Sequence, residues 1–186
     1  MNESHTQAES GGDIDCGYAP FAFQDLPPRK GPRPATFRRP LHIQCNGHGD
    51  RRYLEELTAA VYSWPYVERN PPLSSSSNTL PIRLEETGAG NDCAAFITPR
   101  EFARVLLGAR TIYLALPLVG AHWAIVRGWA EPHYLCSHGL IPAGALVVYT
   151  PRDQDELSIC YSLFLAAYTA VSKWSNETRQ CARDVN

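Results

Sequence analysis

Residues 150–174, TPRDQDELSICYSLFLAAYTAVSKW, form the most strongly patterned stretch of the chain. Its apolar residues return every three or four positions, which is the spacing of a buried helix face, and they are Leu157, Cys160, Tyr161, Phe164, Tyr168 and Val171. Thr150 as cap, Pro151 in the first turn and Asp153 as the acidic member of a capping box predict where the helix starts. We therefore expect a long helix here that covers the core.

Shorter patterned segments lie upstream of this helix. In residues 111–116 the larger aliphatic side chains occupy every second position, which is the period of a strand. Residues 145–149 are a short apolar run typical of a buried strand. Residues 80–84 are a third strand candidate. Helical spacing predicts two more helices, over residues 51–64 behind an Asp50 cap and over residues 119–129.

Residues 98–107 fit two structures. Thr98, Pro99 and Glu101 make a good capping box for a helix whose apolar residues would be Phe102, Val105 and Leu106. The same residues also fit a strand that turns near Gly108 into the strand over residues 111–116. The residues alone leave both readings open.

The mixed order of strands and helices predicts an α+β fold, with a mainly antiparallel sheet covered on one face by helices. The length of 186 residues suits a single domain. We expect a disordered tail over residues 1–20, the domain over residues 21–175 and a polar tail over residues 176–186. Within the domain, the proline-rich residues 21–40 should form an extended arm.

Composition argues against several classes of partner. The formal net charge of −2 gives no broad basic field for nucleic acid or an anionic membrane. The longest apolar runs are far too short to span a bilayer, and the N-terminus resembles no signal peptide, so we expect a soluble, cytoplasmic protein. The six cysteines form no closely spaced pairs, so no metal site is expected, and without a secretory signal we expect no disulfides either. Nucleotide-binding and hydrolase signatures are missing as well.

Histidines supply one candidate for catalysis. His133 lies in a loop after residues 129–132, where a neutral imidazole could act as a general base or simply bond to the backbone. His42, His48 and His138 have no spacing that would gather them around a metal, and we interpret them as ordinary loop residues. His122 is expected at the surface of a helix.

Two pairs of polar residues are further candidates. Arg104 and Tyr113 would face each other if residues 101–106 form a strand, giving a cation beside a phenol that suits an enolate or carboxylate, or an ordinary cross-strand contact. Tyr149 and Arg152 flank the strand-to-helix turn, where they could bind an anion together with helix amides, or where Tyr149 could simply pack in the turn with Arg152 exposed. On the arm, Arg29 and Arg33 could close over an acidic ligand or pin the arm to surface carboxylates. Their positive charge alone makes them candidates for substrate binding.

Five motifs in a fixed order carry a resemblance to a known family. They are Asp25-Leu26-Pro27 with the following Arg29, Gly31, Arg33 and Pro34, then Arg100-Glu101-Phe102-Ala103, residues 111–116, residues 128–133 and residues 149–153. In this order the chain resembles the fungal bioluminescence luciferase family and its luciferase-domain relatives. The resemblance implies a small α+β domain that uses no flavin, metal or nucleotide. It also favours a strand over residues 101–106.

The resemblance further implies a chemistry. The family's luciferase oxidises a hydroxylated α-pyrone with dioxygen through a peroxide that loses carbon dioxide. This sequence departs from the family pattern, because Arg104 and Leu106 replace a His-x-His pair and Tyr113 replaces a histidine, whereas His133 remains. The likely bases are lost while the rest of the family pattern remains, which favours a change of chemistry. We therefore expect a cofactor-independent enzyme of fungal secondary metabolism that acts on a polyketide, α-pyrone or phenolic. Its expected reaction is a cyclisation or isomerisation without redox change, which includes pericyclic ring closure.

Luciferase-like oxygenation and non-catalytic binding of an aromatic metabolite stay open as alternatives. We expect Arg104, Tyr113 and His133 to be catalytic, with substrate contacts from Arg29, Arg33, Phe102, Trp129, Tyr149 and Arg152. The expected partner is a small conjugated molecule, with no metal or cofactor, and a homodimer is left open.

Overall fold

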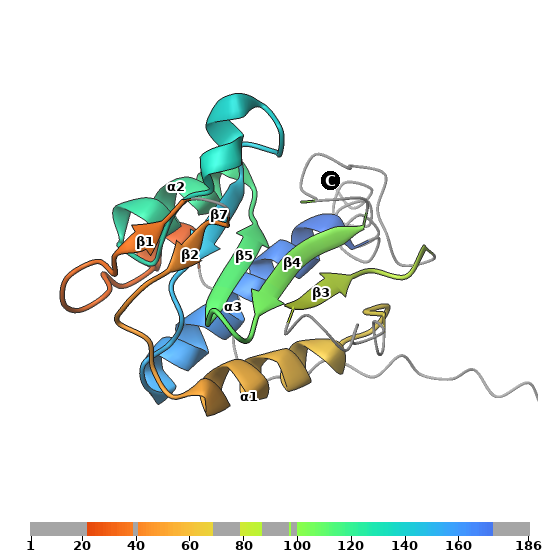
Figure 1. Cartoon of the computed structure of the whole chain (residues 1–186). Coiled ribbons are helices and arrows are strands. Elements are labelled where there is room, and N and C mark those ends of the chain that lie inside the picture. Colours follow the sequence, from red (N-terminus) through yellow and green to blue (C-terminus); the bar gives the residue numbers. More distant parts are fainter. Residues whose placement is uncertain (1–21, 39–40, 69–78, 87–96, 98–99, 173–186) are drawn as a thin grey trace, which may run out of the picture.

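The computed structural model describes residues 22–38, 41–68, 79–86, 97 and 100–172, and Figure 1 shows how their elements are arranged. The expected tails over residues 1–20 and 176–186 lie outside the described residues.

A five-stranded antiparallel sheet forms the centre of the domain. Its strands lie in the order β3-β4-β5-β7-β6, and their bounds are β3 Thr79–Arg83, β4 Glu101–Leu106, β5 Thr111–Ala115, β6 Ala130–Pro132 and β7 Ala145–Val148. A small second sheet pairs β1 (Thr36–Phe37) with β2 (Ile43–Gln44). Together with the helices, this confirms the predicted α+β fold.

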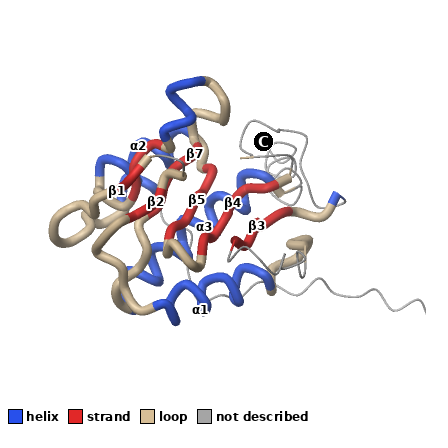
Figure 2. Tube along the Cα trace, viewed as in Figure 1, coloured by secondary structure: helices blue, strands red, loops and turns tan. Residues whose placement is uncertain are grey.

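Helices cover one face of the large sheet. The bounds are α1 Arg51–Tyr62, α2 Leu118–Val126 and α3 Gln154–Val171, with short 3-10 helices η1 (Phe23–Asp25) and η4 (Tyr134–His138). α3 packs behind β4 and β5 and against α1, as Figures 1 and 2 show. Among the described residues, no helix combines the length and apolarity that a membrane crossing requires.

α3 begins later than the sequence predicts. Gln154 is its first residue and Asp153 is its cap, with the Asp153 carboxylate accepting a hydrogen bond from the Glu156 amide at 2.9 Å. Thr150 and Pro151 precede the helix, and the Glu156 side chain bonds to Arg29 and Arg152. The capping-box pattern therefore identified the helix but placed its start too early, because Asp153 takes the cap position itself.

Residues 101–106 form strand β4, so the helix suggested by the capping box is wrong. Arg104 lies directly opposite Tyr113 on β5, as the strand interpretation predicts. The pairing of β4 with β3 contains a β-bulge, because Ile82 lies opposite Ala103 whereas the next residue, Arg83, lies opposite Glu101. Phe102 is the extra residue of this bulge.

The bulge changes which side chains share a face. In a regular strand Glu101 and Arg104 would point to opposite faces, since side chains alternate. Here Phe102 and Ala103 are both buried in the core beside the helices, while the Glu101 carboxylate bonds to the Arg104 guanidinium on the other side. The bulge therefore brings an ion pair to the sheet face that lacks α1 and α3.

The structure extends the arm beyond residue 40 to Gln44, the last residue of β2. The part that forms β1 and β2 lies over this second face, whereas Leu26, near the start of the arm, packs into the core beside the helices. Figure 1 shows β1 and β2 in front of the large sheet, on the side opposite α3. Gln44 fixes the arm there: it is 2% exposed, its amide N–H donates to the Thr111 hydroxyl, and its side-chain oxygen accepts from the Thr150 amide at 2.9 Å. A buried side chain with several bonds holds β2 rigidly against β5 and β7.

Candidate functional site

Polar side chains cross the second face of the sheet in one row. Arg104 on β4 pairs with Tyr113 on β5, Tyr113 pairs with Val147 on β7, and Val147 pairs with Glu131 on β6. Directly paired residues point to the same face of a sheet. The register therefore aligns a cation, a phenol and a carboxylate across four strands.

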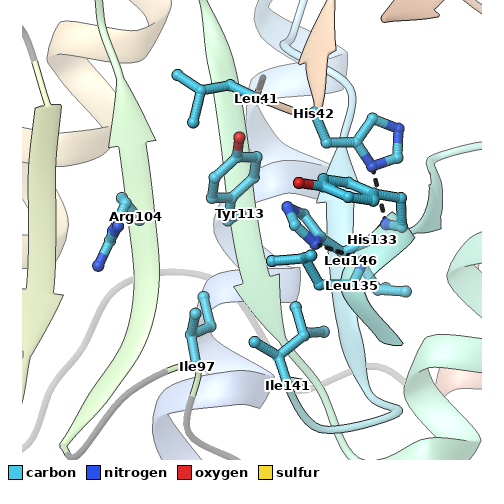
Figure 3. Close-up of a pocket in the computed structure, with 11 residues that line it drawn as sticks. Leu41, His42, Ile97, Arg104, Tyr113, His133, Leu135, Ile141 and Leu146 are labelled. Atoms are coloured by element: carbon cyan, nitrogen blue, oxygen red, sulfur yellow. Dashed lines mark hydrogen bonds between the residues drawn. The ribbon is translucent and has the colours of Figure 1, made fainter. Parts of the chain in front are cut away.

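A cavity of about 260 Å³ lies over the centre of this row. Most of its wall is apolar and consists of Leu41, Ile97, Leu135, Ile141, Ala145 and Leu146. Its polar and aromatic wall consists of His42, Arg104, Tyr113, His133 and Tyr134. Figure 3 shows Tyr113 projecting between Arg104 on one side and the ring of His133 on the other. The cavity therefore joins residues from the arm, the sheet and η4.

The charge of Arg104 is held by a buried carboxylate. Its guanidinium bonds to both oxygens of Glu101, at 2.5 and 2.8 Å, and Glu101 is fully buried. The hydrogen bonds that Arg104 donates to Glu101 are the main cause that raises the pKa of Arg104. Arg83 lies 3.6 Å from the same carboxylate, so two guanidinium groups surround one anion. The cluster keeps a positive charge at the cavity, where the Arg104 side chain is 32% exposed.

Tyr113 presents an unsatisfied hydroxyl. The residue is 7% exposed, and its hydroxyl has no hydrogen-bond partner within the part of the chain that the structure describes. Burial raises its pKa to about 12, although the Arg104 cation and the backbone of His42 act in the opposite direction. The phenol is therefore neutral at pH 7 and free to donate a hydrogen bond to a molecule in the cavity.

His133 presents the second neutral donor. Its Nδ1 accepts a hydrogen bond from the Leu135 amide at 3.3 Å, so the neutral ring carries its proton on Nε2. Burial and the neighbouring His42 lower its pKa to about 4. The ring lies edge-on to Tyr113, with 4.8 Å between ring centroids. At pH 7 this imidazole is a weak base but a ready hydrogen-bond donor.

Of the nine residues predicted for the site, Arg104, Tyr113 and His133 line the cavity together. Phe102 lies in the core beside the helices, because the bulge turns it there, and it contacts the ring of Tyr168. Trp129 is also buried on the helix side, where its indole N–H donates to the Pro27 carbonyl at 2.6 Å. Neither aromatic residue is part of the cavity wall.

The remaining predicted residues fix the arm rather than line the cavity. Arg29 lies over the rings of Trp129 and Tyr149 and pairs with Glu156 at 3.0 Å. Arg152 bonds to the same carboxylate of Glu156, and Arg33 donates to the Ile125 carbonyl at 2.7 Å. Pinning of the arm, one of the two roles that the sequence allows for Arg29 and Arg33, agrees with this geometry.

Tyr149 is close to the row without lining the cavity. Its hydroxyl donates to Glu131 at 3.0 Å, and the same carboxylate bonds to His42. Sequence reasoning missed both Glu131 and His42. Glu131 lies between Ala130 and Pro132, in a segment where sequence reasoning singled out only Trp129 and His133. His42 alternates with apolar neighbours in the way of a strand residue, a signal that could have placed it on the sheet.

No cluster in the described part of the chain is arranged to bind metal: no group of three or more His, Cys, Asp or Glu side chains is suitably placed there. The described cysteines, Cys45, Cys136 and Cys160, are free thiols. Around the cavity, Arg104, Tyr113 and His133 offer a cation and two neutral donors beside an apolar space, an arrangement suited to an oxygen that gains negative charge.

Comparison with known proteins agrees with the resemblance noted in the sequence. The luciferase domain matches residues 99–167, from before β4 through most of α3. The luciferases of Armillaria ostoyae, Armillaria gallica and Armillaria mellea are each 30% identical to this chain over 154 residues, which cover 73% of this chain and 57% of each relative. This chain thus spans little more than half the length of these relatives, and no solved structure matches it. Over residues 99–167, the chain thus matches the luciferase-domain family.

Proposed function

We propose that this protein is a cofactor-independent enzyme of fungal secondary metabolism that cyclises or isomerises a small conjugated enol, such as an α-pyrone or phenolic polyketide, without redox change. The observation that carries the proposal is the convergence of Arg104, Tyr113 and His133 on one mainly apolar cavity. Such a reaction needs a shaped cavity and groups that stabilise a polarised transition state, and the residues around this cavity can provide both.

In this proposal the enol is bound as its enolate, after it has lost its proton to water, and Arg104 binds the oxygen that carries the negative charge. A guanidinium keeps its proton when partly desolvated, and the pairing with Glu101 fixes its orientation. The bond is strongest when charge accumulates on the substrate oxygen, so it favours the transition state over the neutral substrate.

Tyr113 and His133 donate hydrogen bonds to a second substrate oxygen. Both are neutral at pH 7, since burial raises the pKa of Tyr113 to about 12 and lowers that of His133 to about 4. Neutral donors polarise a carbonyl without the energetic cost of burying two more charges. This assigns His133 the role of carbonyl donor in preference to that of general base.

The size of the cavity restricts the substrate. Its volume of about 260 Å³ is just below the roughly 300–1,000 Å³ of typical ligand pockets. One ring, or two fused rings, suits this space better than a long polyketide chain. Leu41, at 52% exposed, leaves the rim of the cavity open to a substituent.

Luciferase-like oxygenation is the second candidate, favoured by the similarity to three fungal luciferases. Dioxygen would then be the oxidant and the substrate the electron donor: a new carbon–oxygen bond forms a peroxide, and its breakdown releases carbon dioxide. The same cation and donors would stabilise the enolate that reacts with dioxygen.

The two candidates differ in oxygen demand. Purified protein is incubated with a panel of 4-hydroxy-2-pyrones and phenolic polyketides, in air and under nitrogen, and products are followed by mass spectrometry and oxygen uptake. Equal turnover in both atmospheres with products of unchanged mass supports the redox-neutral reaction. Oxygen uptake that matches product formation overturns it in favour of oxygenation.

Variants separate catalysis from binding. Arg104→Met should lower turnover by about 100-fold, since it removes one stabilising group of the transition state. Arg51→Met is the matched control, because Arg51 is an exposed residue of α1 that pairs with Glu55. If ligands bind wild type, Arg104→Met weakens that binding and no ligand is ever converted, the protein is a binding protein and the enzyme proposal is wrong.

A further inference from the structure

Glu131 is the most heavily bonded group on the cavity side of β6. One carboxylate oxygen accepts hydrogen bonds from the Thr36 hydroxyl at 2.8 Å and from the His42 ring at 2.6 Å, and the other accepts from the Tyr149 hydroxyl at 3.0 Å. Burial raises the pKa of Glu131, but these three bonds together lower it below its ordinary value. Glu131 is therefore an anion that joins the arm to the sheet.

The anion determines the protonation of His42. An ionised carboxylate only accepts hydrogen bonds, so Nε2 of His42 must be the donor toward Glu131. Nδ1 accepts a hydrogen bond from the Tyr134 amide at 3.1 Å, so it carries no proton. His42 is fully buried, and burial lowers its pKa although Glu131 acts in the opposite direction. Both ring nitrogens are thus used, and the neutral ring has one tautomer.

The contact with Tyr134 lies next to His133. Tyr134 is the first residue of η4, and His133 is its cap, with Nδ1 accepting from the Leu135 amide. The bond from the Tyr134 amide to His42 fixes the peptide that leaves His133, and the two imidazole rings are 5.3 Å apart. Figure 3 shows the rings of His42 and His133 on the same side of Tyr113, with both amide contacts drawn.

We propose that Glu131 and His42 are positioning residues, which hold the first turn of η4 so that the Nε2–H of His133 points into the cavity toward the substrate. The catalytic consequence rests on the proposed function, whereas the orientation of His133 does not. His42 and Thr36 lie outside residues 99–167, so the site is complete only when the arm is bound to the luciferase domain.

Two substitutions of His42 separate its two hydrogen bonds. His42→Asn places an oxygen near the position of Nδ1 and can still accept from the Tyr134 amide, but it cannot reach Glu131. His42→Gln places a donor near Nε2 for Glu131, but it loses the acceptor for Tyr134. If the contact with Tyr134 positions His133, the Asn variant should keep more function than the Gln variant.

The readout is the tautomer of His133 by nitrogen NMR of histidine-labelled full-length protein, together with steady-state kinetics. Wild type should show His133 protonated on Nε2. His42→Gln should give a mixture of tautomers and lower kcat about tenfold with KM within twofold, and His42→Asn should fall between. His122→Asn is the matched control, because His122 is exposed on α2 and should leave both readouts unchanged.

Opposite results overturn the inference. An unchanged His133 spectrum and unchanged kcat in His42→Gln show that the pair does not position His133, even when wild type turns substrate over. A changed spectrum in a protein that converts no substrate supports the positioning role and refutes the proposed function. If the His42 variants do not fold, Thr36→Val removes one bond to Glu131 from the surface of the arm, and it must shift the His133 spectrum in the same direction.

Discussion

The two faces of the large sheet are built by the same strands but have opposite chemistry. On the face toward α1 and α3, strands β5 and β7 contribute Ile112, Leu114 and Val148, all fully buried in the main apolar core. On the other face the same two strands contribute Tyr113 and Val147, in a small cluster next to charged and polar groups. The first face resembles an ordinary protein core, and the second holds groups that a core excludes.

This difference indicates which face stabilises the fold and which serves the site. Fully burying one large apolar side chain stabilises by roughly 1.5–3 kcal/mol, and the helix face has many such residues. The cavity face instead buries the Glu101 carboxylate, a neutral imidazole at His133 and an unpaired phenol at Tyr113. Each of these groups is costly to bury, which is typical of a site preorganised for a ligand.

The largest expected effect comes from the helix face. Phe164 is fully buried on α3, so Phe164→Ala should lower the free energy of unfolding by roughly 3–5 kcal/mol, by loss of apolar burial and by the cavity that remains. Chemical denaturation measures the loss. Ligand affinity of the folded protein should stay within twofold of wild type, and a large loss of affinity at full folding would contradict the separation of the two faces.

The second prediction concerns the cavity face, where His133 should make the free energy of unfolding depend on pH. The unfolded His133 has a pKa near 6.5 and the folded one about 4, so between these values the unfolded chain binds more protons. The free energy of unfolding should therefore fall as the pH is lowered from about 6.5 to about 4, by roughly 3 kcal/mol for this residue. Denaturation at several pH values measures this slope.

His133→Asn is the control for that slope. An Asn side chain can still cap η4 by accepting from the Leu135 amide, but it does not titrate. His42 and His48, whose pKa values are also lowered, remain in both proteins and act alike in both. Parallel loss of stability in wild type and variant over this range would show that His133 is not held neutral by the fold.

Much of the helix face could be predicted from the sequence. Asp50 caps α1 as expected, and the apolar spacing of α3 identified its buried side, including Leu157, Cys160, Phe164 and Tyr168. These predictions succeed because periodicity reports burial directly. The same alternation placed Arg104 opposite Tyr113 once residues 101–106 were taken as a strand.

The rest of the site depends on contacts that no local pattern reveals. The bulge at Phe102 moves Glu101 to the cavity face, although a spacing of three residues in a regular strand predicts opposite faces. The arm brings His42 to Glu131 across 89 positions of sequence. The charges of Arg29, Arg33 and Arg152 suggested ligand binding, but tertiary contacts use them to fix the arm.

The smallest expected change in stability comes from the cavity face, and it sharpens the comparison most. Tyr113→Phe removes a buried hydroxyl that has no partner among the described residues, so the free energy of unfolding should change by less than about 1 kcal/mol and can rise. Turnover should fall about 10- to 100-fold, because a donor to the substrate is lost.

Tyr168→Phe is the matched control. Tyr168 is also buried, on the helix face, but its hydroxyl donates to the Pro65 carbonyl at 2.9 Å. This variant should therefore lose about 1 kcal/mol of stability and keep full turnover. The reverse pattern, with Tyr113→Phe less stable and fully active, would mean that the phenol is a structural residue and that the cavity face is merely a second core.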